Sequence, residues 1–313
     1  MSLRVAFLGN DPWSVPPLEA LAGEPETEVV LVVTNPPRPA GRGAEPTATA
    51  VATATRSLGL PLLEVDGVRR GAGLTALHAA APDVVVVVAY GELLSREVLE
   101  LASLGAVNLH FSLLPRWRGA APVQHALLAG DDRTGVTVMR MDEGLDTGPI
   151  LGTLEDPIRP EDDAGSLGER LARLGSRLLV GVIRQLGAEG LPARLQQDAR
   201  ATFAPKFTAA DRILHWDEPA AEVVRRVRAL APEPGATTTF RGQPFKVLSA
   251  AVGHDEFAGD PPGTLVAADD RGVAVSTGEG VVRIQEVAAA GRRRMAAADW
   301  ARGARPEDRE RLG

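Results

Sequence analysis

The chain has 313 residues, 44% of them hydrophobic and 24% charged, which suits a globular protein with two domains. It contains no cysteine, which excludes a disulfide framework, a thiol nucleophile and a thiolate metal site. Its formal net charge of −7 argues against a simple nucleic-acid-binding protein, because phosphate contacts need Lys and Arg.

The first part of the chain alternates short apolar runs with helical patterns. The apolar runs are Leu3–Leu8, Val29–Thr34, Pro61–Val65, Val84–Ala89 and Ala106–Phe111. The helical patterns are Pro16–Ala22, Thr47–Leu58, Gly73–Ala80 and Arg96–Leu101. Continuous Val-rich runs indicate strands buried on both faces. The pattern predicts an α/β fold with a doubly wound, mostly parallel, Rossmann-like sheet.

The start of the chain and its longest apolar run bear on localisation. The segment Met1–Gly9 is β-like and lacks the basic start and small-residue cleavage site of a signal peptide. The run Val84–Tyr90 is strand-sized, far below the roughly 18 residues of a membrane helix. We therefore expect a cytoplasmic protein without a membrane partner.

The pattern changes from Lys206 onward. A helical segment, Ser166–Leu186, leads through a polar connection to the helical pattern Ala220–Leu230. Short β-like segments follow at Ala236–Phe240, Phe245–Ala251, Gly263–Ala267, Val273–Ser276 and Val281–Val287. Turn signals separate them, which predicts a small β-barrel of the oligonucleotide-binding (OB) type. The expected division is a catalytic domain over 1–187, a linker over 188–205 and a barrel domain over 206–313.

The barrel region 206–313 carries 16 basic and 16 acidic residues, so the negative charge lies in the first two-thirds. Its arginines come in groups: Arg225, Arg226 and Arg228, then Arg292, Arg293 and Arg294. Such groups can form a positive stripe on a neutral domain, or they can be solvated surface charges.

Several common motifs are missing. No GxxxxGK[ST] sequence is present, and Gly9-Asn10-Asp11-Pro12 lacks the later glycines of a dinucleotide fingerprint. The five histidines are scattered and no HExxH motif occurs, so we expect no metal.

The segment Ala106–Ser112 carries the most chemical information. Side chains alternate along a strand, so Asn108, His110 and Ser112 share one face. Three polar groups on a buried strand each need a partner, since an unpaired one costs about 1–3 kcal/mol. An amide can donate to a developing oxyanion, and an imidazole can exchange a proton near neutral pH. The alternative is a core histidine bonded to a backbone carbonyl and an asparagine at a strand end.

The next segment places two arginines around a tryptophan: Arg116, Trp117 and Arg118. Arginine beside an aromatic ring suits an anionic ligand or nucleic acid. An ordinary turn bounded by prolines, with Trp117 in the core, is the alternative. Farther along, Asp142 and Asp146 lie in a loop rich in acid and glycine. Either carboxylate can orient His110, or either can be a turn residue before glycine, and spacing does not choose between them.

These residues resemble a known family. Asn108-x-His110-x-Ser112-Leu-Leu-Pro and Leu145-Asp-Thr-Gly148 resemble the signature of the 10-formyltetrahydrofolate-dependent formyltransferases. The strings Ser112–Pro122 and Thr134–Ile150 are similar to those of the methionyl-tRNA formyltransferases within that family. The likeness extends over nearly the whole chain, for example to Thr202–Lys206 and Gly291–Met295.

The resemblance implies an enzyme that transfers a formyl group from 10-formyltetrahydrofolate to the α-amino group of initiator methionyl-tRNA for translation initiation. It implies a catalytic trio of Asn108, His110 and Asp146, in which Asn108 and protonated His110 stabilise an oxyanion. The implied folate contacts are Val88, Tyr90, Gly91, Leu93, Ser112, Leu113, Leu114, Pro115 and Asp142. The implied tRNA contacts are Arg42, Arg116, Arg118, Lys206, Arg292, Arg293 and Arg294. We expect a monomer.

Three other functions use similar residues. A sibling formyltransferase acting on an amino sugar nucleotide or another small amine would retain the trio without needing the barrel. A hydrolase would release formate without an acceptor, and a non-enzymatic folate- or tRNA-binding module would require the trio to be inert. The chain also departs from the family pattern at Gly9–Trp13, where the family usually has Gly-Thr-Pro-Asp-Phe. The resemblance therefore does not identify the residues of the methionine pocket.

Overall fold

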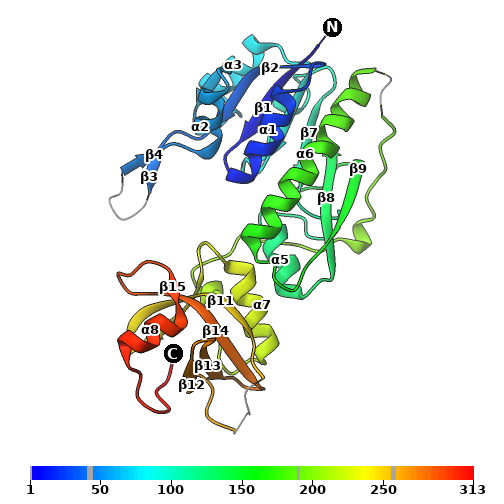
Figure 1. Cartoon of the computed structure of the whole chain (residues 1–313). Helices are drawn as coiled ribbons and strands as arrows, with labels where there is room; N and C mark the ends of the chain where they lie inside the picture. Colours follow the sequence, from blue (N-terminus) through cyan, green and yellow to red (C-terminus); the bar gives the residue numbers. More distant parts are fainter. Residues whose placement is uncertain (1, 41–44, 189–190, 255–258) are drawn as a thin grey trace. The chain divides into compact units, whose positions relative to one another are not determined.

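The computed structural model describes residues 2–40, 45–188, 191–254 and 259–313 (Figure 1). The chain divides into two compact units that interleave along the sequence. The first unit comprises Met1–Pro122, Arg133–Pro157 and Gly168–Pro205. The second comprises Val123–Asp132, Ile158–Leu167 and Lys206–Gly313.

A seven-stranded sheet forms the centre of the first unit, in the order β5-β2-β1-β6-β7-β8-β9. The strands are β1 (Leu3–Gly9), β2 (Thr27–Thr34), β5 (Leu62–Glu64), β6 (Val84–Val88), β7 (Ala106–His110), β8 (Arg133–Arg140) and β9 (Ile150–Pro157). The pairs among β5, β2, β1, β6 and β7 are parallel, whereas β8 pairs antiparallel with both β7 and β9. The predicted mostly parallel α/β sheet is confirmed.

Both faces of this sheet are covered by helices. Ala6 and Leu8 of β1 join a buried cluster that includes Leu77 of α3 (Gly71–Ala80) and Val98 of α4 (Arg96–Leu99). Helices α1 (Val15–Ala22) and α6 (Ala164–Ala188) lie over the opposite face (Figure 1). A Cβ at Gly175 of α6 would lie 2.8 Å from a Leu109 methyl group, so glycine allows this helix to approach β7 closely.

The chain differs from prediction between the second and third predicted strands. A helix was expected from Thr47, but Glu45–Thr47 forms strand β4, which pairs antiparallel with β3 (Arg38–Ala40). Helix α2 (Ala50–Ser57) begins later, because the hydroxyl of Thr49 accepts a hydrogen bond from the amide of Ala52 at 3.0 Å. This is an N-cap, which ends the extended segment before the helix.

The second unit contains an antiparallel sheet in the order β10-β11-β14-β13-β12, with β15 paired to β14. Its elements are α5 (Pro122–Ala129), α7 (Ala220–Leu230), β10 (Ala236–Phe240), β11 (Gln243–Val252), β12 (Leu265–Asp269), β13 (Gly272–Ser276), β14 (Val281–Ala289), β15 (Met295–Ala296) and α8 (Ala297–Ala304). Helix α8 was not predicted. Its Trp300 packs against Phe240 and Phe245, with ring centroids 4.9 and 4.7 Å away, and so closes the core of this unit.

The end of the chain connects the two edge strands of this sheet. Leu312 bridges to Phe240 in β10, and Arg311 bridges to Thr264, which directly precedes β12. The five predicted strands and the helix Ala220–Leu230 are all present. In the described part of the chain, no helix has both the length and the apolar character to cross a membrane.

Candidate active site

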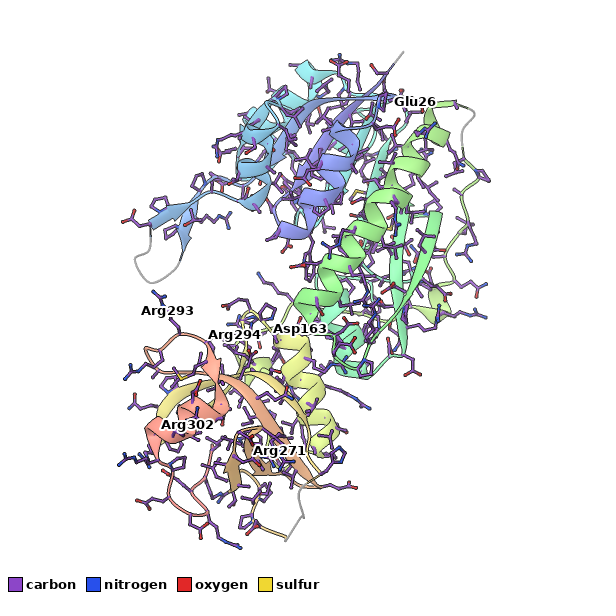
Figure 2. The ribbon with its side chains drawn as sticks, viewed as in Figure 1. Glu26, Asp163, Arg271, Arg293, Arg294 and Arg302 are labelled. Atoms are coloured by element: carbon purple, nitrogen blue, oxygen red, sulfur yellow. The ribbon has the colours of Figure 1, made fainter. Side chains whose placement is uncertain are left out.

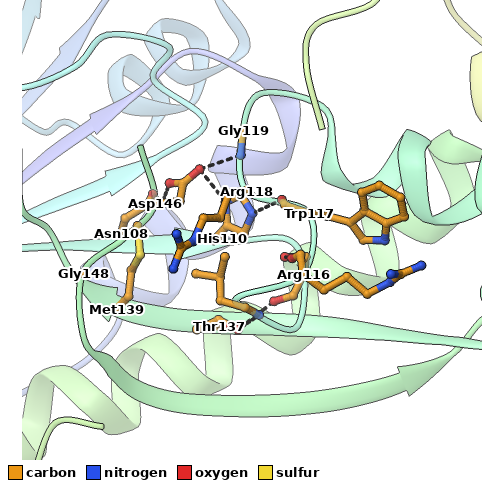
Figure 3. A network of polar contacts seen from close by, with 12 residues as sticks. Asn108, His110, Arg116, Trp117, Arg118, Gly119, Thr137, Met139, Asp146 and Gly148 are labelled. Carbon is orange, nitrogen blue, oxygen red and sulfur yellow. Dashed lines mark hydrogen bonds and ion pairs between the residues drawn. The ribbon is translucent and has the colours of Figure 1, made fainter. Parts of the chain in front are cut away.

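Asn108, His110 and Asp146 lie together at the end of β7 (Figure 3). Nδ2 of Asn108 donates to Oδ1 of Asp146 at 3.5 Å, and Nδ1 of His110 lies 3.7 Å from Oδ2 of the same carboxylate. Asn108 and His110 are 8% and 5% exposed. Asp146, rather than Asp142, is therefore the carboxylate that faces the pair.

The second ring nitrogen of His110 contacts the loop that follows β7. Nε2 of His110 lies 2.8 Å from the carbonyl oxygen of Trp117. Because a carbonyl oxygen only accepts, this nitrogen carries the proton. In the imidazolium form, the remaining proton sits on Nδ1 beside Asp146. The ring is thus held from both sides.

Trp117 and Asp146 share an unusual backbone conformation. Their φ angles are 62° and 53°, in the left-handed region that non-glycine residues rarely adopt. Such residues cost about 1–3 kcal/mol each and persist where neighbouring contacts impose them. Both supply a group that faces His110, so the strain is located where the imidazole is oriented.

Gly119 fixes the carboxylate of Asp146. Its amide donates to Oδ2 of Asp146 at 2.8 Å. Its φ is 125°, and a Cβ at this position would lie 2.7 Å from the carbonyl oxygen of Ala204. Only glycine suits both the conformation and the close approach to the backbone at Ala204.

Ser112 and Thr137 hold the loop between His110 and Gly119. The hydroxyl of Ser112 donates to the carbonyl oxygen of Arg116 at 2.6 Å. Thr137 of β8 donates to the carbonyl oxygen of Ser112 at 2.7 Å and accepts from the amide of Leu114 at 3.2 Å. Both hydroxyl-bearing residues are fully buried. Sequence reasoning missed Thr137, because one threonine among the buried residues of β8 gives no signal of a role in the site.

Val88 and Tyr90, predicted to contact folate, are buried, while Gly91 and Leu93 are exposed. The carbonyl oxygen of Val88 accepts from the hydroxyl of Ser14 at 2.7 Å, and that of Tyr90 accepts from Nδ2 of Asn10. The Tyr90 hydroxyl is buried without a hydrogen-bond partner among the described residues. Burial also raises the pKa of this phenol.

Asn10 was not predicted as a site residue, yet it connects three strand ends. Besides its bond to Tyr90, its Oδ1 accepts from the amide of Asn35 at 2.7 Å and from the hydroxyl of Thr34 at 3.0 Å. The only signal in the sequence was its place after the first strand, where ligands of parallel sheets bind.

Asp142, also predicted to contact folate, is exposed and closes its own turn. Its Oδ1 accepts from the amide of Gly144 at 3.1 Å and from the hydroxyl of Thr147 at 2.6 Å. Of the predicted loop residues 113–115, Leu114 is 5% exposed and packs with Met139 and Ile150. Leu113 and Pro115 are partly exposed.

A cavity of about 700 Å³ lies beyond the ends of β5 and β6. Its lining contains the two arginines Arg69 and Arg70, the acids Asp66 and Glu92, and Ser95. It adjoins the predicted folate segment through Glu92, but it includes none of the catalytic trio.

The predicted tRNA contacts fall in several places. Arg116 is exposed and stacks on Trp117, with its guanidinium carbon 4.3 Å from the ring centroid. Arg118 is 4% exposed, and its guanidinium donates to Gln196 and Asp198. A buried guanidinium of this kind does not fit the predicted tRNA contact. Arg42 lies outside the described residues.

The remaining predicted contacts belong to the second unit. Lys206, Arg292, Arg293 and Arg294 are exposed. Arg293 projects from the loop before β15, and Arg294 forms an ion pair with Glu286 (Figure 2).

The family models for formyl transferases match both parts of the chain. The formyl transferase model matches residues 3–183, and the model of the C-terminal domain of formyl transferases matches residues 206–305. The chain belongs to the formyl transferase family. The resemblance seen in the sequence is therefore confirmed.

Full-length relatives of this formyl transferase carry a more specific name. The methionyl-tRNA formyltransferase of Roseiflexus castenholzii is 44% identical over 100% of both chains. That of Thermobifida fusca is 46% identical over 99% of each chain. Among solved structures, HypX from Aquifex aeolicus in complex with tetrahydrofolic acid has a TM-score of 0.66 at 16% identity. The match covers 96% of this formyl transferase and 47% of HypX, about half its length, and shows likeness of fold alone.

Proposed function

We propose that this formyl transferase moves a formyl group from 10-formyltetrahydrofolate to the α-amino group of initiator methionyl-tRNA. The observation that carries the proposal is the cluster of Asn108, His110 and Asp146 in a chain whose full-length relatives are methionyl-tRNA formyltransferases. An amide and an imidazole that both face one carboxylate, at 3.5 and 3.7 Å, suit acyl transfer.

The chemistry follows from the available donors. The neutral amine attacks the formyl carbon, a new C–N bond forms, and the bond to N10 of the folate breaks. Asn108 uses one N–H toward Asp146 and retains a second, which donates to the oxyanion on the formyl carbon. One such donor contributes about 10²–10³ in rate.

His110 contributes charge and Asp146 contributes orientation. Because the Nε2 proton of His110 is directed to Trp117, the imidazolium stabilises the oxyanion through its positive charge. Asp146 balances this charge and helps to move the proton from the attacking amine to the departing N10.

The folate binds, in this proposal, beyond the carboxyl ends of β6 and β7, where ligands of parallel sheets bind. The proposed contacts are Val88, Tyr90, Gly91, Leu93, Ser112, Leu113, Leu114, Pro115 and Asp142. The buried Tyr90 hydroxyl supports this location, since a polar ligand group would satisfy it. Val88 and Ser112 take part through their backbone, because their side chains are fully buried.

The second unit is proposed to bind the tRNA as an OB-like barrel. The antiparallel sheet supports this, together with the chain end that bridges its edge strands at Phe240 and Thr264. The proposed tRNA contacts are Arg42, Arg116, Lys206, Arg292, Arg293 and Arg294. The domain division at 1–187, 188–205 and 206–313, the monomeric state and the cytoplasmic location stay predictions.

One assay tests the function. Purified protein is incubated with 10-formyltetrahydrofolate and initiator methionyl-tRNA, and formylmethionyl-tRNA is measured. We expect formylation by the wild type, a loss of about 10²–10⁴-fold in His110→Ala, and no loss in His215→Ala, which changes an exposed histidine of the second unit. A wild type that ignores the tRNA but formylates an amino sugar nucleotide would support the sibling function instead.

A further inference from the structure

The segment 194–204 lies along the loop that follows β7 and along the loop that carries Asp146. Arg194 and Ile150 exchange both backbone hydrogen bonds at 2.8 Å. The amide of Arg118 donates to the carbonyl oxygen of Thr202, and the amide of Ala204 donates to that of Arg118, each at 2.8 Å. The segment is thus a backbone partner of the site within the first unit.

Gln196 is the point where this segment reaches Asp146. Its Nε2 donates to the carbonyl oxygens of Asp146 at 2.8 Å and of Gly148 at 2.7 Å. It is partly buried, whereas the residues around it from 192 to 200 are exposed. Both amide protons are therefore used on the loop in which Asp146 adopts its left-handed conformation.

Arg118 fixes the other end of the Gln196 amide. Its Nε and Nη2 donate to Oε1 of Gln196 at 3.1 and 2.9 Å. Nη2 also donates to Oδ1 of Asp198 at 2.8 Å. An acceptor that receives two guanidinium donors cannot turn toward the carbonyls, so Arg118 determines which way the amide points.

We propose that Gln196 and Arg118 are positioning residues for formyl transfer: the Arg118–Gln196 pair holds the backbone of Asp146 so that its carboxylate faces His110. The proposal rests on the proposed function. It gives Arg118 a role inside the protein in place of a contact with tRNA. The pair reaches the trio from two directions, because the amide next to Arg118, that of Gly119, also donates to Asp146.

The side-chain chemistry makes the pair specific. A carboxylate at 196 would still accept from Arg118 but would face two carbonyl oxygens without a proton to donate. A leucine at 196 has a similar size but would remove both the bonds from Arg118 and the bonds to the two carbonyl oxygens. If the loop that carries Asp146 then moves by about 1 Å, this displacement is enough to lower the rate about 100-fold.

The test compares Gln196→Leu, Gln196→Glu and Arg118→Leu with Leu195→Ala, a matched control on the neighbouring exposed residue. Steady-state formylation of methionyl-tRNA is measured over a range of pH, with thermal unfolding in parallel. We expect kcat to fall about 10- to 100-fold in the first three variants, with KM for both substrates changed less than about threefold. Asp146→Asn is measured alongside them, and the pH profile of kcat in the three variants should change in the same direction as it does in Asp146→Asn.

A double variant, Arg118→Leu with Gln196→Leu, shows whether the two residues act as one unit or independently. We expect it to lose no more activity than the worse single variant, because the pair acts through one amide. Multiplicative losses, or a raised KM for tRNA with normal kcat in Arg118→Leu, would overturn the proposal. The proposal would also be overturned if the pH profile of kcat were unchanged and the loss of activity in each variant matched its loss of thermal stability. A wild type without formylation activity would instead refute the proposed function.

Discussion

The carboxylate of Asp146 lies 3.7 Å from Nδ1 of His110, while its other contacts come from Asn108 and the Gly119 amide. The carboxylate is 14% exposed, so its interaction with the ring is only weakly screened. A single loop residue therefore connects Asn108 and His110 of β7 to the loop after it.

Replacing Asp146 with asparagine tests whether the negative charge of this side chain contributes to the reaction. We expect Asp146→Asn to fold and to retain an acceptor for the Gly119 amide, but to lower kcat about 100-fold or more, because it no longer balances an imidazolium. Initial rates with saturating folate and tRNA measure the effect. Equal activity in Asp146→Asn and wild type would show that the negative charge is not used.

Gly119 should not tolerate a side chain. A Cβ would lie 2.7 Å from the carbonyl oxygen of Ala204 at a φ of 125°, so Gly119→Ala should displace the loop and lose the bond to Asp146. We expect a stability loss of about 1–3 kcal/mol and a fall in kcat of about 10-fold or more. Gly59→Ala, at a φ of 67° with open space around it, is the control for the conformational cost. Equal kcat in both variants would contradict this account.

The fold could be predicted because burial on both faces of the sheet produces continuous apolar runs such as Val84–Val88. Strand β9 was missed because its outer half is exposed and polar at the sheet edge. Strands β3 and β4 were missed because Pro39 pairs with Pro46, and proline ordinarily argues against a strand. Helix α8 was missed although its buried residues Ala297, Ala298, Trp300 and Ala301 recur at helical spacing, because a short Ala-rich segment gives a weak apolar signal.

The site could be predicted where strand geometry controls it. Alternation along β7 placed Asn108 and His110 on one face, and the structure agrees. The choice between Asp142 and Asp146 depends on loop dihedral angles, which residue spacing does not encode. Gln196 could not be found, since it is one polar residue in a polar connection and its role arises only from tertiary contacts.

Asn10 should be important for the folate side of the site. Its amide connects the ends of three strands through Thr34, Asn35 and Tyr90, so Asn10→Ala should cost about 2–4 kcal/mol and raise KM for the folate more than it lowers kcat. Chemical denaturation and folate-dependent kinetics measure both effects. Asn10→Asp keeps the two acceptor contacts but sets a carboxylate oxygen against the Tyr90 carbonyl oxygen, so it should also raise the folate KM. A normal folate KM in Asn10→Ala would contradict the prediction.

The exposed arginines 292–294 should contribute charge to tRNA binding. Replacing all three with alanine should weaken methionyl-tRNA binding. The slope of log Kd against log salt concentration should fall by about one to three, since each phosphate contact contributes about one to that slope. Folate affinity should be unchanged. Arg302→Ala, which removes an arginine paired with Asp299 in the same unit, is the control. An unchanged salt slope would exclude these residues from phosphate contacts.

Asp11 should make stability depend on pH. Burial raises the pKa of its carboxyl above the ordinary value of 3.8, while its side chain caps the amide of Trp13. The folded state therefore binds the proton at a higher pH than the unfolded state, and this group reduces stability as pH rises through the folded pKa. The substitution Asp11→Asn removes the charge but retains a side-chain oxygen that caps the amide of Trp13.

Asp11→Asn should consequently be more stable than wild type at neutral pH, and the difference should shrink as pH falls toward 3.8. Asp11→Ala removes the cap as well and should be about 1 kcal/mol less stable than Asp11→Asn at every pH. Denaturant unfolding at several pH values measures both differences. If the gap between Asp11→Asn and wild type widened on acidification, the carboxylate would have to be stabilised in the folded protein, and burial would not be the dominant influence on it.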